Sequence, residues 1–311
     1  DAMDACIARL EKEEKLAGVV LTSAKKTFFA GGDLNDLIKA TPDVAELFMN
    51  STNEIKKQLR RLEHLKAPVV AAINGAALGG GYEICLACNH RIAINDPKTK
   101  IGLPEVTLGL LPGGGGVVRL TRLLGLEAAA PFLLEGKQVS PDQAKAAGLI
   151  DDLATDQADM IAKAKAWCKA NPNAKQPWDT QGYKVPGGTP SSPALAQKLP
   201  IIPAILKNKT KGCYPAPEAI LSAAVESLQV DIDTAMRVEG RYFTKLATGP
   251  VAKNMIKAFF FQLQEIGKGA SRPKGFEQHV TKKVGILGGG MMGAGIAYSS
   301  AMSGIEVVLK D

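Results

Sequence analysis

Residues 74–83 read Asn-Gly-Ala-Ala-Leu-Gly-Gly-Gly-Tyr-Glu, and they follow the apolar run Val69–Ile73. The apolar run predicts a buried strand, and the glycines predict a tight turn that opens a helix continuing to Leu86. Glycine lets a ligand approach the backbone closely, and the free N–H groups at a helix start favour negative charge. The stretch therefore predicts an anion-binding turn; for any single glycine-rich turn, a plain tight loop is the alternative.

A second glycine-rich turn precedes the first one in the chain. It reads Phe29-Ala30-Gly31-Gly32-Asp33-Leu34 and follows a buried strand expected over residues 16–22. Two backbone N–H groups aimed at one point form an oxyanion hole, which stabilises charge that develops on a carbonyl oxygen. The two turns taken together are candidates for such a pair.

Two glutamates accompany these turns. Glu83 follows the glycines Gly79 to Gly81 within one helical turn, and Glu105 lies in the proline-containing turn Gly102-Leu103-Pro104-Glu105. A carboxylate in an apolar stretch is costly to bury without a partner or a task, and burial raises its pKa toward the range of acid–base catalysis. From the residues alone, the alternative is a partly exposed Glu83 that the helix dipole stabilises.

These turns, continued by Gly-Leu-Pro-Glu-Val-Thr-Leu-Gly-Leu-Leu-Pro-Gly-Gly-Gly-Gly at residues 102–116, resemble the crotonase (enoyl-CoA hydratase) superfamily in order and spacing over residues 16–167. The resemblance implies an α/β fold of stacked ββα turns and hydration of trans-2-enoyl-CoA to L-3-hydroxyacyl-CoA. It places the oxyanion-hole N–H groups on Gly32 and Gly80 and the catalytic carboxyls on Glu83 and Glu105. It implies substrate contacts at Ala30, Gly31, Asp33, Leu34, Gly79, Gly81, Pro104 and Gly113.

Two other functions stay open at this point. One is a different CoA-thioester reaction on the same fold, such as Δ3-to-Δ2 enoyl-CoA isomerisation, which can use the same acid–base pair. The other is a non-catalytic module that only binds acyl-CoA within an assembly. The presence of both Glu83 and Glu105 favours hydration over a different CoA-thioester reaction, whereas the binding module stays open.

The last thirty residues have the pattern strand, Gly-x-Gly-x-x-Gly turn, helix and strand. The turn reads Gly288-Gly289-Gly290-Met291-Met292-Gly293, and Asp311 follows where an acidic ribose ligand is expected. This pattern predicts the first βαβ unit of a dinucleotide-binding Rossmann domain. We expect this domain to be truncated, with Gly288, Gly290, Gly293 and Asp311 as its NAD-binding residues.

The order of these segments resembles the multifunctional fatty acid β-oxidation family, whose α-subunits join enoyl-CoA hydratase to NAD-dependent 3-hydroxyacyl-CoA dehydrogenase. The resemblance implies a thiolase (β) subunit as partner and an oligomeric assembly. We expect a crotonase-like domain over residues 1–170, with an incomplete N-terminus because the family's fold begins before the first helix. A linker and helical connector over 171–280 and the start of the Rossmann domain over 281–311 follow.

Composition narrows the class of protein further. The chain has 311 residues, a net charge of +7 and 46% hydrophobic residues, which is typical of a globular protein. Its lysines and arginines are scattered without interleaved aromatic residues, which argues against nucleic-acid binding and is compatible with a phosphate-bearing ligand. The apolar run 67–88 contains Pro68, Asn74 and Glu83, so we expect a soluble, intracellular protein of the bacterial cytoplasm, or alternatively of the mitochondrial matrix; membrane association is left open.

The cysteines and histidines carry no predicted function. Five cysteines in a long chain argue against a disulfide framework, and the Cys85–Cys88 pair lacks the second pair of ligands that a zinc site needs. We therefore expect no metal and read this pair as buried helix residues. His64, His90 and His279 lie outside the motifs.

Overall fold

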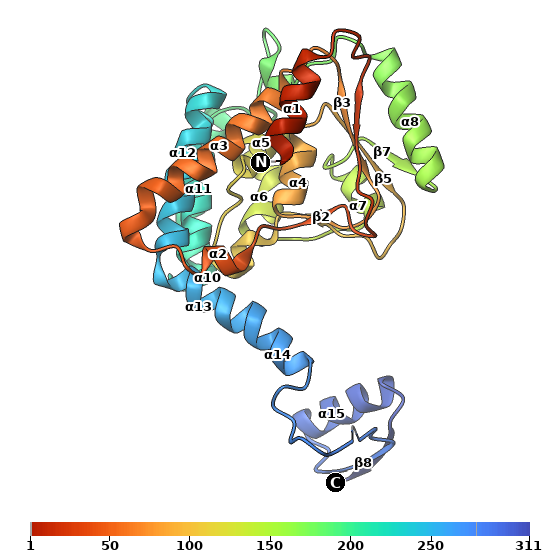
Figure 1. The fold of residues 1–311 in the computed structure, drawn as a ribbon. Coiled ribbons are helices and arrows are strands. Elements are labelled where there is room, and N and C mark those ends of the chain that lie inside the picture. The colour runs from red at the N-terminus through yellow and green to blue at the C-terminus, as the bar shows by residue number, and fades with distance from the viewer. Residues whose placement is uncertain (1, 278) are drawn as a thin grey trace. The chain divides into compact units, whose positions relative to one another are not determined.

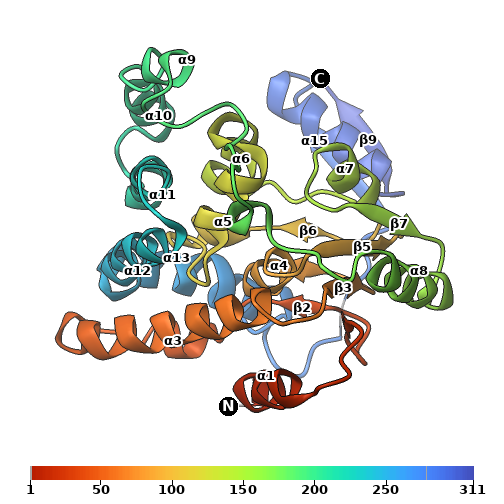
Figure 2. The ribbon, with the colours of Figure 1, turned by 90° about the horizontal axis from the view of Figure 1, so that it is seen from above.

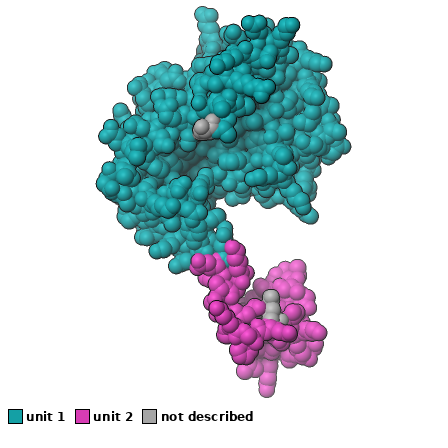
Figure 3. Space-filling model, viewed as in Figure 1, with its two compact units in different colours: residues 1–264 teal, residues 265–311 magenta. Residues whose placement is uncertain are grey.

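The computed structural model describes residues 2–277 and 279–311. They form two compact units, residues 1–264 and 265–311 (Figures 1 and 3). The first unit contains two parallel sheets. A four-stranded sheet has the order β1 (Val19–Leu21), β3 (Val69–Ile73), β5 (His90–Ile94) and β7 (Asp152–Ala154), and a three-stranded sheet has the order β2 (Phe29–Ala30), β4 (Ala77–Leu78) and β6 (Ile101–Gly102).

Both faces of the four-stranded sheet are buried. On β3, Val70 and Ala72 pack with Met160 of the helix that follows β7, whereas Ile73 belongs to the main core on the opposite face. All five residues of β3 are buried, as the continuous apolar run predicted. Figure 2 shows α8 beside β3, β5 and β7, on the side away from α4 and α5.

The helices surround these sheets. Before and between the strands lie α1 (Ala2–Lys12), α2 (Leu34–Leu37), α3 (Ala45–Glu63), α4 (Gly80–Leu86), α5 (Gly116–Leu124), α6 (Leu126–Leu134), α7 (Pro141–Ala146) and α8 (Gln157–Ala170), with 3-10 turns at Pro42–Val44 (η1) and Pro104–Leu108 (η2). After them come the 3-10 turn Pro177–Asp179, α9 (Pro193–Ala196), α10 (Ile202–Thr210), α11 (Pro215–Ser227), α12 (Ile232–Thr248), α13 (Pro250–Ile256), the π-helical segment Lys257–Gln262 and α14 (Leu263–Gly267).

Helix α12 of the predicted connector packs along α3 in the same compact unit as residues 1–170 (Figure 2). The predicted boundaries at 170 and 280 stay a prediction. Ser140 and Gln143 form a reciprocal capping box at the start of α7. The glycine-rich turn of residues 29–34 begins with the short strand β2, and residues 101–108 contain β6 and η2.

The second unit consists of β8 (Lys283–Leu287), α15 (Met291–Met302) and β9 (Glu306–Lys310). The two strands pair in parallel, so the predicted strand, turn, helix and strand are confirmed. Within residues 2–277 and 279–311, no helix combines the length and the apolar character that a membrane crossing requires.

Candidate active site

The register of the three-stranded sheet brings the predicted site residues to one edge. Ala30 of β2 is aligned with Leu78 of β4, which is aligned with Gly102 of β6. Because the strands are parallel, the residues that follow them emerge at the same edge of the sheet. The two glycine-rich turns and the turn that carries Glu105 therefore meet at this edge of the sheet. Each of the three turns was predicted from its own sequence motif.

The first two of these turns present backbone N–H groups. Gly31 (φ 74°) and Gly79 (φ 57°) adopt left-handed backbone conformations that favour glycine, and the Gly31 N–H donates to Leu78 O at 2.9 Å. The next residues, Gly32 and Gly80, have N–H groups without an acceptor among the residues that the structure describes. No described atom lies within 4 Å of a Cβ placed on Gly31 or Gly32, so there is space for a ligand beside these donors.

The other residues predicted to contact substrate have different surroundings. Ala30 and Pro104 stand directly at the sheet edge, at the end of β2 and the start of η2, and Leu34 is the first residue of α2. Asp33 caps α2, because its Oδ1 accepts the Asn35 N–H at 2.8 Å. The structure gives packing reasons for two glycines, since a Cβ on Gly81 would lie 2.1 Å from Phe29 O and one on Gly113 would lie 2.9 Å from the Phe243 ring.

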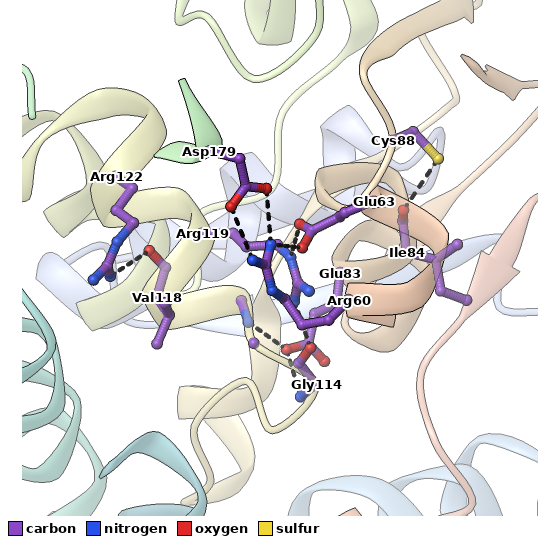
Figure 4. Close-up of polar contacts among 12 residues, drawn as sticks. Arg60, Glu63, Glu83, Ile84, Cys88, Gly114, Val118, Arg119, Arg122 and Asp179 are labelled. Carbon is purple, nitrogen blue, oxygen red and sulfur yellow. Dashed lines mark hydrogen bonds and ion pairs between the residues drawn. The ribbon is translucent and has the colours of Figure 1, made fainter. Parts of the chain in front are cut away.

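Glu83 is a buried, hydrogen-bonded carboxylate. It lies on α4 with 4% of its surface exposed, and its Oε1 accepts the N–H groups of Gly114 and Gly116, both at 2.7 Å (Figure 4). Burial, and next the negative charge of Glu239, raise the pKa of Glu83 to about 7, against the two N–H bonds and Lys56, which lower it. Near neutral pH this carboxyl can accept a proton.

Glu105 is the second buried carboxyl, and its hydrogen bonding differs from that of Glu83. It lies in η2, and its buried Oε2 has no hydrogen-bond partner among the described residues. Burial, and next the charge of Glu83, raise the pKa of Glu105 well above its usual range. Two carboxyls whose surroundings differ in this way can divide the roles of base and acid, because the two N–H donors favour the ionised form of Glu83 and burial favours the protonated form of Glu105.

The turn at Gly79 and Gly80 lies beside both carboxyls. A Cβ on Gly79 would lie 2.7 Å from Glu105 Oε1 and 3.5 Å from Gly31 Cα, and a Cβ on Gly80 would lie 4.0 Å from Glu83 Oε2. Both carboxyls thus border the turn that carries the free Gly80 N–H. The site can polarise a carbonyl oxygen at that N–H and exchange protons beside it.

Alanine at Gly79 is expected to damage both stability and activity. The conformation at φ 57° and ψ −129° is strained for a residue with a Cβ, and the added atom would push Glu105 away. We expect the free energy of unfolding to fall by about 1–3 kcal/mol. Denaturant unfolding measures this loss, with Gly267→Ala as the control because Gly267 has no positive φ and its Cβ would meet no described atom within 4 Å. Equal stability of the two variants would contradict the expectation.

Buried ion pairs support the loop that binds Glu83. Arg119 of α5 donates to Gly114 O at 2.8 Å and pairs with Glu63 of α3 at 2.7 Å, both side chains being fully buried (Figure 4). Arg60 also pairs with Glu63, and it donates to both carboxylate oxygens of Asp179. Asp179 belongs to the segment predicted as a linker, so this segment contributes to the support of the site.

Sequence reasoning missed three groups around Glu83. It named Gly113 but not the Gly114 and Gly116 N–H groups that hold the carboxylate. It also missed Glu239 of α12, a fully buried carboxylate that pairs with Lys56 of α3 at 3.1 Å. A usable signal was present, because Glu239 shares a helix face with buried Met236 and with Gly240, at the spacing of a core stripe.

Two of the cysteines, Cys85 and Cys88, pack in the core of the first unit. Cys85 and Cys88 are buried at the end of α4, and burial raises the pKa of both thiols. Their Sγ atoms lie 3.2 Å and 3.3 Å from the helix carbonyls of Gly81 and Ile84. Among residues 2–277 and 279–311, no cluster of three His, Cys, Asp or Glu side chains has the arrangement of a metal site.

The glycine turn of the second unit fits a dinucleotide pyrophosphate. Gly288 has φ 94°, and a Cβ on Gly293 would lie 1.7 Å from Gly288 O, so the close packing of α15 on the turn requires glycine there. Gly290 immediately precedes α15. The Gly289 N–H donates to Asp311 Oδ1 at 2.7 Å, which places the acidic residue beside this turn.

Comparisons with known proteins agree with this geometry. The family model described as enoyl-CoA hydratase/isomerase matches residues 1–177, and the NAD-binding domain of 3-hydroxyacyl-CoA dehydrogenase matches residues 283–311. An enoyl-CoA hydratase structure from Bacillus halodurans is 21% identical with a TM-score of 0.54, and the match covers 83% of this chain and 87% of that one. An enoyl-CoA hydratase/isomerase from Mycobacterium paratuberculosis is 19% identical with a TM-score of 0.54, covering 82% and 85%.

At these identities the two structures show the fold alone. An enoyl-CoA hydratase from Geobacillus kaustophilus has 26% identity and a TM-score of 0.49 over 84% of this chain and 83% of that one. The predicted crotonase-like α/β fold, followed by a partial Rossmann element, is confirmed.

Proposed function

The chain belongs to the enoyl-CoA hydratase/isomerase family, and we propose that it hydrates trans-2-enoyl-CoA to L-3-hydroxyacyl-CoA. The proposal rests on one observation: two buried carboxyls lie beside one turn, and they differ in their hydrogen bonds. Glu83 accepts two N–H bonds, and the buried Oε2 of Glu105 has no partner among the described residues. Hydration of a double bond needs one group that takes a proton and one that gives a proton.

In the proposed mechanism, the N–H groups of Gly32 and Gly80 bind the thioester carbonyl oxygen. Glu83 takes a proton from a water molecule as the water oxygen bonds to Cβ of the substrate, and the electrons of the double bond shift toward the carbonyl as an enolate. Glu105 then gives its proton to Cα. The enolate charge develops at the oxyanion hole, where hydrogen bonds from fixed donors strengthen most in the transition state. A proton returned from Glu83 to Glu105 through solvent restores the starting state.

Isomerisation of a 3-enoyl-CoA is the second candidate, because the family includes isomerases. That reaction moves a proton between carbons without activating a water. The hydrogen bonds that hold Glu83 in its ionised form favour hydration, which needs a base for water in addition to the acid Glu105.

The proposal extends to the second unit. When bound, NAD accepts a hydride, and in this protein it would oxidise the 3-hydroxyacyl-CoA that hydration produces. Gly288, Gly290, Gly293 and Asp311 would hold the dinucleotide, and the match to the NAD-binding domain of 3-hydroxyacyl-CoA dehydrogenases supports this role. A β-oxidation complex with a thiolase subunit is the assembly that such a pair of activities fits.

Turnover of crotonoyl-CoA and of a longer enoyl-CoA by the full-length protein tests the hydratase proposal. We expect the enoyl-thioester absorbance to disappear with formation of the 3-hydroxy product. Because Glu83 must be ionised, kcat/KM is expected to fall about tenfold per pH unit below its pKa of about 7. At high pH the rate falls again when Glu105 loses its proton. A folded protein that binds acyl-CoA without turnover would favour the binding module instead.

A further inference from the structure

We infer that Glu239 is a positioning residue of the active site: from α12 it fixes the glycine loop whose N–H groups hold Glu83. This inference rests on the proposed hydratase function. Helix α12 lies beyond residues 1–177, the segment that the family model matches. The predicted connector, to which α12 belongs, would therefore supply a working part of the hydratase site.

Two carboxylates share the N-terminus of α5. Glu83 Oε1 accepts the N–H groups of Gly114 and Gly116, whereas Glu239 Oε1 accepts the Gly115 N–H at 2.8 Å. Glu239 Oε2 accepts the Val118 N–H at 3.1 Å. The first N–H groups of a helix lack partners within the helix, and here they are divided between the two side chains. Movement of the loop away from Glu83 would therefore break the bonds to Glu239 as well.

A charged side chain at this place needs compensation, since its surface exposure is zero. Lys56 of α3 supplies it: its Nζ lies 3.1 Å from Glu239 Oε1 and donates to Met236 O at 2.7 Å. A buried ion pair of this kind contributes little net stability compared with apolar residues of similar size. The hydrogen bonds of Glu239 to the loop therefore indicate a role in fixing the geometry and the electrostatic field of the site.

The charged groups that face Glu83 come from four elements. Glu105 lies on η2, Lys56 and Glu63 on α3, Glu239 on α12, and Arg119 on α5, where it bonds Gly114 O. Among them, Glu239 is the largest charge contribution that raises the pKa of Glu83, and Lys56 opposes it with a smaller effect. Neutral Gln at 239 should therefore leave Glu83 a weaker base, because the repelling charge is gone.

The test compares the wild type with Glu239→Gln in the full-length protein, using crotonoyl-CoA from pH 5 to 9. We expect the acid-side midpoint of kcat/KM to move down by roughly one pH unit in the variant. At the optimum, kcat is expected to fall about three- to tenfold with little change in KM. Glu218→Gln is the matched control, an exposed glutamate on α11, and it should reproduce the wild type.

A purely structural role would give a different result. If Glu239→Gln changes only the melting temperature and keeps the wild-type pH midpoint, the inference is overturned. Should Glu239→Gln fail to fold because Lys56 is left unpaired, the double variant Lys56→Met with Glu239→Gln removes both charges. It should still shift the midpoint downward, by less, since Glu239 has the larger effect. A wild type without turnover would contradict the hydratase proposal instead, so the two failures are distinguishable.

Discussion

Substitution of Glu105 by Gln is expected to lower kcat for hydration by about a hundredfold or more. The amide keeps the shape of the side chain but cannot deliver the proton that Cα needs. The buried Oε2 of Glu105 has no partner among the described residues, so the substitution breaks no hydrogen bond at that atom. The loss should therefore appear in kcat, with binding of a saturated acyl-CoA unchanged.

A measurement of thermal stability distinguishes loss of the proton donor from damage to the fold. Burial raises the pKa of Glu105 in the folded protein, so its ionisation is more costly there than in the unfolded chain. The carboxyl therefore favours the folded state most below its unfolded pKa of about 4.5, and this contribution is lost as the pH rises through the folded pKa. At pH 8 the Gln variant should melt no lower than the wild type. Glu218→Gln serves again as the control, and a folded Glu105→Gln protein with full activity would exclude Glu105 as the acid.

Substitution of Glu83 by Gln is expected to reduce hydration by a similar factor, about a hundredfold or more, for a different reason. The amide oxygen can still accept the N–H groups of Gly114 and Gly116, so the loop keeps its hydrogen bonds. It cannot take a proton from water. The residual rate should lose the acid-side dependence that the wild type shows near pH 7, because the group that titrates there is gone.

The same pair of variants separates the two family reactions. Parallel assays with a 2-enoyl-CoA and a 3-enoyl-CoA measure hydration and isomerisation in each protein. Loss of hydration in both variants supports the proposed roles. A reaction that survives Glu83→Gln and disappears in Glu105→Gln would instead identify an isomerase, because a proton shift between carbons needs no base for water.

The site residues that could be predicted from the sequence lie in short, continuous segments of the chain. The stretch from Asn74 to Glu83 contains a turn, a helix start and a carboxylate within ten residues, so its motif carries both structure and chemistry. Glu105 was found because a proline-containing turn and the family's spacing mark it. The βαβ pattern at the C-terminus was recognisable for the same reason, since strand, glycine turn and helix are adjacent in the chain.

What sequence reasoning missed depends on contacts between distant segments. Glu239 approaches the site only because α12 packs along α3; its place on the buried face of α12 indicates burial, but no local motif identifies the segment that it contacts. Gly81 was assigned to substrate contact as part of its motif, and the structure adds a packing reason, because a Cβ there would lie 2.1 Å from the Phe29 carbonyl oxygen. Neighbouring backbone and ligands both require glycine at a close approach, so a glycine motif alone does not show which of the two it serves.

The two proposed oxyanion donors are main-chain groups placed by strand pairing: Gly32 and Gly80 each lie two residues beyond the aligned pair Ala30 and Leu78. Their direction is set by the sheet and does not depend on any side chain. Exchange of Glu83 or Glu105 for another residue would thus remove a proton donor or acceptor and leave thioester activation in place. A scaffold built in this way can change the reaction that follows enolate formation by one or two substitutions while it continues to recognise the same class of thioester.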